Sequence, residues 1–186
     1  MMIPLGFFGS GVSADFELIS STFVGSSGTV STVSFDVSAL ASKYKHLQIR
    51  WVATTGTANQ SIFVRFNSDG AASSNYATHR LTAQGSSVIS QSQTSTGAAY
   101  VFGTYNGTSA TLPTSGITDI LDFASTNKNK TVRSFAGLSA TSTSTNEIGL
   151  YSHFWNSTAA ITTVNWSLGG STLNAGSRVS LYGIKG

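Results

Sequence analysis

The residues best suited to chemistry in this chain are its three histidines and one pair of aspartates. His46, His79 and His153 stand far apart in the sequence and lack the short spacing of metal-binding residues. Asp119 and Asp122 are three positions apart in a segment that alternates like a β-strand, so their side chains should face opposite sides. An acid–base pair needs two carboxylates that converge. We therefore expect neither a metal site nor a catalytic pair here.

The two aspartates have a simpler interpretation as ion-pair partners. The strand expected after them carries Lys130 and Arg133, and we expect one aspartate to pair with a basic residue of this kind. A Ca²⁺ site would require a loop to bring further oxygen ligands.

Sequence signatures of the common enzyme classes are absent. The chain has no G-x-S-x-G, no P-loop and no H-E-x-x-H segment. It contains no Cys, which excludes thiolate chemistry, disulfides and cysteine zinc sites. No convergent set of nucleophile, base and metal ligands can be named. We therefore expect a protein that is not an enzyme and needs no cofactor.

Aromatic side chains are the best candidates for a binding surface, because flat rings stack on flat partners such as sugar faces. Aromatic residues in strands belong more often to the core, and this is the interpretation that we favour. Trp155 is the best exception because a polar turn follows it, so we name it as a candidate glycan contact. The aromatic residues considered are Tyr100, Tyr105, Tyr151, Trp155 and Trp166.

Charged side chains are scarce. They make up 9% of the 186 residues, and the formal net charge is +3, whereas roughly a quarter of the residues in ordinary globular proteins are charged. Basic residues cluster only at Lys43/Lys45 and at Lys128/Lys130/Arg133, which is not the concentrated patch that nucleic acids require. So little charge gives weak repulsion between copies. We expect no nucleic-acid partner and a surface suited to an oligomer.

The clearest structural signal is the stretch from residue 43 to residue 67. In both 46–52 and 61–67 apolar residues occupy every second position, which is typical of half-buried strands. Because two well-patterned strands follow each other in the sequence, we expect them to form the centre of an antiparallel sheet.

Similar segments recur along the chain at the spacing of an all-β domain. We expect residues 15–186 to form a single antiparallel β-sandwich, jelly-roll-like, with about ten to twelve strands. One short helical turn is expected at 36–42, and 116–124 should form a hairpin with 131–138. No apolar run approaches the roughly 20 residues of a membrane helix. Further strands are expected at 16–24, 29–36, 76–84, 87–93, 98–104, 147–154, 160–168 and 178–184.

Residues 1–14 form an apolar, glycine-rich N-terminal arm in this interpretation. Ile3, Leu5, Phe7 and Phe8 are costly to leave in water. The segment lacks the positive start of a signal peptide. It is either a flexible start or an arm that docks on a neighbouring subunit, and these four residues are the candidate assembly interface.

Three segments resemble a group of tailed-bacteriophage virion proteins. Residues 44–50, YKHLQIR, resemble a strand of that group, and 121–130, LDFASTNKNK, resemble its "ILDYAS…K.K" hairpin. Residues 176–185, GSRVSLYGIK, are similar to its closing "GSR.SLYGIK", and the MIPLG start is similar as well. The resemblance follows the same order over nearly the whole chain. It implies a structural protein of the virion, in the head or the tail, and carries over no catalytic residues.

The leading hypothesis is therefore a head decoration (cement) protein of the virion. Its partners would be the major capsid protein or other virion proteins and further copies of itself, with a trimer favoured and no membrane partner. The alternative is a tail or fibre component that binds a host surface glycan. Its contacts would come from Trp155 and from the loops 54–60, 139–146 and 169–176.

Overall fold

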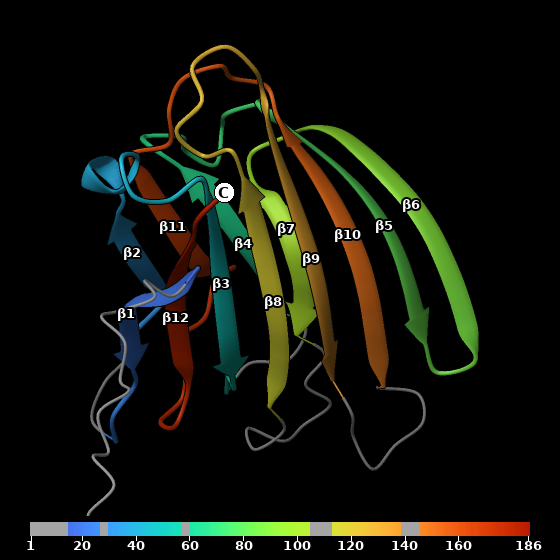
Figure 1. Cartoon of the computed structure of the whole chain (residues 1–186). Coiled ribbons are helices and arrows are strands. Elements are labelled where there is room, and N and C mark those ends of the chain that lie inside the picture. Colours follow the sequence, from blue (N-terminus) through green and yellow to red (C-terminus); the bar gives the residue numbers. More distant parts are fainter. Residues whose placement is uncertain (1–14, 27–29, 57–59, 105–112, 139–145) are drawn as a thin grey trace, which may run out of the picture.

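The computed structural model describes residues 15–26, 30–56, 60–104, 113–138 and 146–186. This part of the chain contains twelve strands in two antiparallel sheets, one of eight strands and one of four (Figure 1). The prediction of an all-β sandwich with ten to twelve strands is confirmed. The predicted arm at 1–14 lies outside the described residues. Among those described, no helix is long and apolar enough to span a membrane.

The predicted short helical turn is a 3₁₀ helix, η1, and the predicted hairpin is formed by β8 and β9. In chain order the elements are β1 (Phe16–Phe23), β2 (Thr32–Asp36), η1 (Ser38–Leu40), β3 (His46–Ala53), β4 (Gln60–Phe66), β5 (Tyr76–Gln84), β6 (Ser87–Thr96), β7 (Ala99–Thr104), β8 (Thr114–Leu121), β9 (Lys130–Leu138), β10 (Glu147–Trp155), β11 (Thr163–Leu168) and β12 (Arg178–Ile184).

The strand order is that of a jelly roll with two insertions. The wide sheet has the order β1-β12-β3-β8-β9-β10-β5-β6, and the narrow sheet has the order β2-β11-β4-β7. Eight of these strands make two facing four-stranded sheets, β1-β12-β3-β8 and β2-β11-β4-β7, which is the wound arrangement of a jelly roll. The hairpins β5–β6 and β9–β10 are inserted between jelly-roll strands. Both join the same edge, and they double the width of one sheet.

The core lies between the two sheets and follows from the alternation of the strands. Trp51 on β3 and Trp166 on β11 meet across the sandwich, with 6.1 Å between ring centroids. Each large apolar side chain removed from water there contributes roughly 1.5–3 kcal/mol. The narrow sheet reaches beyond β8, because β7 also packs against β9, β10 and β5.

The expectation that β3 and β4 form the centre of one sheet is wrong, because they lie in different sheets. β3 lies between β12 and β8 in the wide sheet, and β4 lies between β11 and β7 in the narrow sheet. Both strands occupy the interior of a sheet, as their apolar patterns indicate. They belong to opposite layers, so their buried faces point toward each other across the core. The connection between them crosses from one layer to the other, and alternation alone does not distinguish this crossing from a hairpin.

Candidate functional site

Strand β10 carries apolar side chains on both of its faces. Tyr151 and Trp155 point into the sandwich and are 4% and 3% exposed, whereas Ile148, Leu150 and Phe154 point outward and are 50%, 55% and 42% exposed. Apolar residues on both faces are typical of strands that are covered on both sides. Within the described part of the chain, the narrow sheet covers only the inner side.

Register places four apolar side chains in one line across the outer face of the wide sheet. Ile117 on β8 is paired with Phe135 on β9, Phe135 with Leu150 on β10, and Leu150 with Leu81 on β5. These side chains are 38–55% exposed. We call this set the apolar row. Directly paired side chains on one face are close enough to act as a single contact surface.

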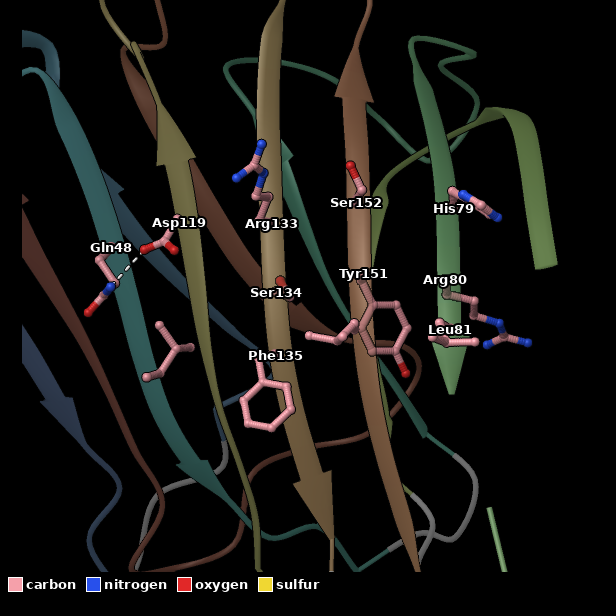
Figure 2. A pocket seen from close by; sticks show the side chains of 12 residues that line it. Gln48, His79, Arg80, Leu81, Asp119, Arg133, Ser134, Phe135, Tyr151 and Ser152 are labelled. Atoms are coloured by element: carbon pink, nitrogen blue, oxygen red, sulfur yellow. Dashed lines mark hydrogen bonds between the residues drawn. The ribbon is translucent and has the colours of Figure 1, made fainter. Parts of the chain in front are cut away.

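A line of polar side chains runs beside the apolar row, displaced from it by two residues on each strand that both lines share. It consists of Gln48, Asp119, Arg133, Ser152 and His79, which are paired in that order from β3 to β5 (Figure 2). The Gln48 amide Nε2 donates to Asp119 Oδ1 at 2.7 Å. The two rows line a hollow of about 540 Å³. An apolar strip with a polar border is the usual anatomy of a protein–protein interface.

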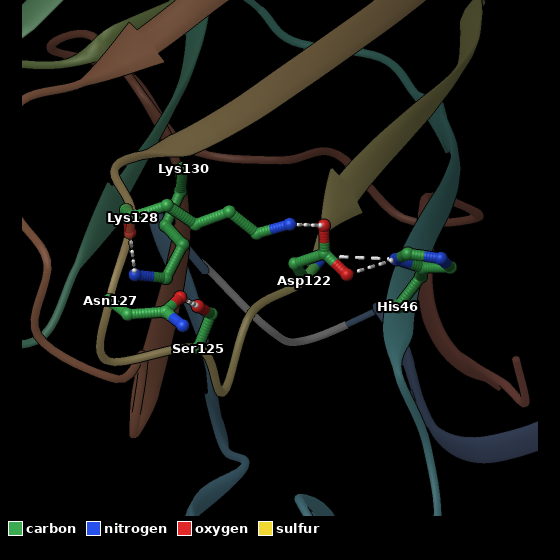
Figure 3. A network of polar contacts seen from close by, with 6 residues as sticks. All are labelled: His46, Asp122, Ser125, Asn127, Lys128 and Lys130. Atoms are coloured by element: carbon green, nitrogen blue, oxygen red, sulfur yellow. Dashed lines mark hydrogen bonds and ion pairs between the residues drawn. The ribbon is translucent and has the colours of Figure 1, made fainter.

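Asp122 joins the ends of neighbouring strands in a polar network (Figure 3). Its Oδ2 lies 2.6 Å from Lys128 Nζ, and its backbone N–H donates to His46 Nδ1 at 2.9 Å. The hydrogen bond from Lys128 holds the pKa of Asp122 below its ordinary value. Asp122 thus pairs with a basic residue, as expected. The partner is Lys128, in the turn before β9, and not Lys130 or Arg133 of the strand.

Lys130 is buried instead, between the β8–β9 turn and the segment that follows β10. Its side chain has no exposed surface, and its Nζ donates to the carbonyl oxygens of Lys128 and Ala159 at 2.9 Å and of Thr158 at 3.3 Å. The ammonium also lies 5.6 Å from the centroid of the Trp155 ring. Burial lowers the pKa of Lys130. This lysine closes the end of the sandwich and offers nothing to a ligand.

The three segments that carry the family resemblance come together in the fold. They contribute β12, β3 and the turn that joins β8 to β9, and these four strands are adjacent in the wide sheet. Tyr44, just before β3, is 5% exposed and covers Gly183 on β12 so closely that a Cβ there would lie 2.5 Å from its ring. The segments therefore build one packed unit, which gives them a structural role.

Trp155, the candidate glycan contact, is only 3% exposed, so its ring offers no open face on which a sugar could stack. The turn after β4 covers it, its indole N–H donates to Asp69 Oδ2 at 2.8 Å, and its ring packs edge-on against Phe66. The favoured interpretation as core is confirmed for Tyr151 and Trp166, whereas Tyr100 is partly exposed. Trp155, the expected exception, belongs to the core as well. Tyr105 lies outside the described residues.

The loops named for a glycan are described only in part. Residues 57–59 and 139–145 lie outside the described residues. In the loop at 169–176, Leu173 is 1% exposed, and it forms isolated β-bridges with Val30 and Thr55. This loop therefore contributes to the closure of the core.

The histidines do not come together. His79 lies on the outer face, His46 contacts Asp122, and His153 is buried between the sheets, where its Nδ1 is 2.9 Å from Thr78 Oγ1. Burial lowers the pKa of His153 to about 4. Thr78 and His153 are 5% and 2% exposed, so no substrate reaches this pair. Among the described residues, no three His, Asp or Glu side chains form a group that could hold a metal.

No protein-family model, curated protein or solved structure matches this chain. The virion role that the three segments imply therefore stays a prediction.

Sequence reasoning missed the apolar row, although one signal was present. In 147–155, Ile148, Leu150 and Phe154 alternate with Tyr151 and Trp155, so neither side of this strand is polar. This pattern shows that β10 has two apolar faces. Only the register shows that residues of three other strands extend the outer face into a row.

Proposed function

We propose that this chain is a structural protein of a tailed-bacteriophage particle, namely a head decoration protein that binds the capsid lattice as an oligomer. The observation that carries the proposal is the apolar row on the outer face of the wide sheet. Burying four half-exposed side chains of this size against a partner contributes on the order of 3–5 kcal/mol. Repetition of this contact over a lattice multiplies its effect.

Three further observations support the proposal. The fold is a jelly roll, an architecture that occurs in viral capsid proteins among others. The charge-poor composition suits a surface that is covered in an assembly. The resemblance to virion proteins rests on segments that form one packed unit of the wide sheet. The partners would be the major capsid protein or other virion proteins, with Ile3, Leu5, Phe7 and Phe8 of the N-terminal arm as a second contact.

The alternative function, a tail or fibre component that binds a host glycan, has lost its main support. Trp155 was the residue that carried it, and this residue is buried. The described glycan loop at 169–176 is held by Leu173 in the core.

Cryo-electron microscopy of the particle that carries this chain tests the proposal. Density for the chain on the icosahedral lattice, with the apolar row against the capsid protein, is the expected result. Density confined to the tail would contradict the decoration role and favour adsorption. Removal of residues 1–11 tests the arm separately, since unchanged assembly would show that the arm is not a contact.

A pair of variants tests the surface itself. Phe135→Ser combined with Leu150→Ser removes the centre of the apolar row, and we expect binding to particles that lack this protein to fall at least about tenfold. Leu18→Ser is the matched control, because Leu18 is 58% exposed on β1, at the opposite edge of the same sheet. Equal binding by both variants would show that the apolar row is not the docking surface.

A further inference from the structure

Strand β6 forms one edge of the wide sheet and lacks the usual protection of an edge. Within the described part of the chain it pairs only with β5, and every residue from Ser87 to Ser95 is exposed. Its ten residues include no charged residue and no proline. Unpaired backbone groups on a long, uncharged edge are a template for another strand.

The other three edges of the sandwich are each protected. β1 carries Glu17 and has a register shift between Leu18 and Ser20. β2 has only five residues and ends in Asp36. β7 has a register shift against β4 and packs against the wide sheet. Short length, charge and bulges are the means by which natural sheets prevent edge pairing, so β6 differs from the rest of the same molecule.

The irregularity of β6 is confined to its end. A register shift falls between Gln93 and Thr96, and Ser95 has a φ of +56°. The preceding seven residues, 87–93, pair in continuous register with β5. A regular segment of this length is a normal strand, so it can accept a full partner strand on its open side.

We propose that β6 pairs antiparallel with β6 of a second copy of this chain, around a two-fold axis near Ser90. The two wide sheets then become one continuous sheet of sixteen strands. In this register Ser90 faces its own copy, Val88 faces Ser92, and Ile89 faces Gln91. No charges of like sign meet, and Val88 and Ile89, 73% and 39% exposed, each gain a cross-strand neighbour that covers part of their surface.

A second copy fits this edge better than a foreign strand. The edge offers no charged group to select a partner of opposite charge, whereas an identical strand matches it in length and composition. An isologous contact of this kind closes after two copies. The inference rests on the self-association included in the proposed function, but not on the capsid partner. The proposed pairing predicts that the purified protein forms a dimer with two-fold symmetry and not a trimer.

Crosslinking of the purified chain tests the pairing directly, because the chain contains no cysteine of its own. We expect Ser90→Cys to form a covalent dimer rapidly under mild oxidation, since directly opposed residues bring their Cβ atoms close. Ser152 is exposed on the outer face, away from the proposed pairing, so Ser152→Cys should not form a covalent dimer. Crosslinking through Ser152 and not through Ser90 would show that copies meet through the outer face and would overturn the proposal.

Sedimentation of a lysine variant gives the second measurement. Ser90→Lys places two ammonium groups at the two-fold axis, and the dimer dissociation constant should rise at least about tenfold. Ser20→Lys, on the exposed edge strand β1, is the matched control and should leave the dimer unchanged. A wild-type chain that is monomeric at high concentration, or a trimer that Ser90→Lys leaves intact, would overturn the pairing. Particle binding is a separate measurement, so failure of the capsid proposal would be recognised independently.

Discussion

Gly116 on β8 lies directly against the indole ring of Trp51 on the neighbouring strand β3. A Cβ at this position would overlap the ring and would also collide with Ala136 on β9. Trp51 is 3% exposed and packs on Trp166, so the ring has little room to move. The absence of a side chain at Gly116 therefore leaves room for the Trp51 ring to pack on Trp166 across the two sheets.

Gly116→Ala should destabilise the protein by overpacking, by roughly 1–3 kcal/mol. Urea unfolding followed by tryptophan fluorescence measures the change. Gly70→Ala is the control, because a Cβ at Gly70 meets no atom within 4 Å and its backbone has no positive φ. Equal stability of the two variants would show that the Trp51 ring has freedom that the packing does not indicate.

Lys130→Met should lower the free energy of unfolding by roughly 1–3 kcal/mol, because three carbonyl oxygens lose the buried ammonium that donates to them. The same change at Lys128 removes an ion pair to Asp122 from a side chain that is 56% exposed, and it should cost at most about 1 kcal/mol. Thermal unfolding of the two variants compares them. A larger loss in Lys128→Met would mean that the surface pair, and not the buried ammonium, closes this end of the sandwich.

His153 should make the stability depend on pH. Its pKa is about 4 in the folded protein and ordinarily 6.5, so between these values the unfolded chain binds a proton that the folded chain does not. The free energy of unfolding should therefore decrease as the pH falls from about 6.5 to about 4, by about 3 kcal/mol from this residue.

The variant His153→Gln should flatten this part of the profile in urea unfolding between pH 7 and pH 4.5. His79→Gln is the control, because the same substitution is made there at an exposed position of β5. A slope that persists in His153→Gln would place the proton uptake on another group.

The two faces of β8 should respond differently to the same substitution. Ile117→Ser on the outer face should change the stability of the single chain by at most about 1 kcal/mol, since Ile117 is 38% exposed. Ile120→Ser on the inner face should cost roughly 3–5 kcal/mol, because Ile120 has no exposed surface. Chemical unfolding measures both. A comparable loss in Ile117→Ser would mean that the outer face is already covered within one chain.

Much of the secondary structure could be predicted from the sequence. Alternation over 46–52, 61–67 and 147–154 identified strands because each has a buried face, and burial acts on every second residue. The pairing of 116–124 with 131–138 was also predictable, since a short polar turn joins the two. Asp122 pairs with Lys128 of this same turn, which is a local contact.

The partners of distant strands were decided only by the tertiary structure. β3 and β4 follow each other in sequence, yet they lie in different sheets, because facing layers bury both apolar faces better than two neighbours in one layer. Trp155 precedes a polar turn, but the segment after β4 brings Asp69 over its indole N–H.

The sequence by itself determined an all-β sandwich, a charge-poor surface and the positions of its strands, since these depend on composition and local alternation. Tertiary structure decided that Leu81, Ile117, Phe135 and Leu150 form one row and that β6 becomes an open edge. Alternation shows which side of a strand is apolar but not which strand lies beside it. Register between distant strands therefore creates the apolar row, and strand order creates the open edge at β6.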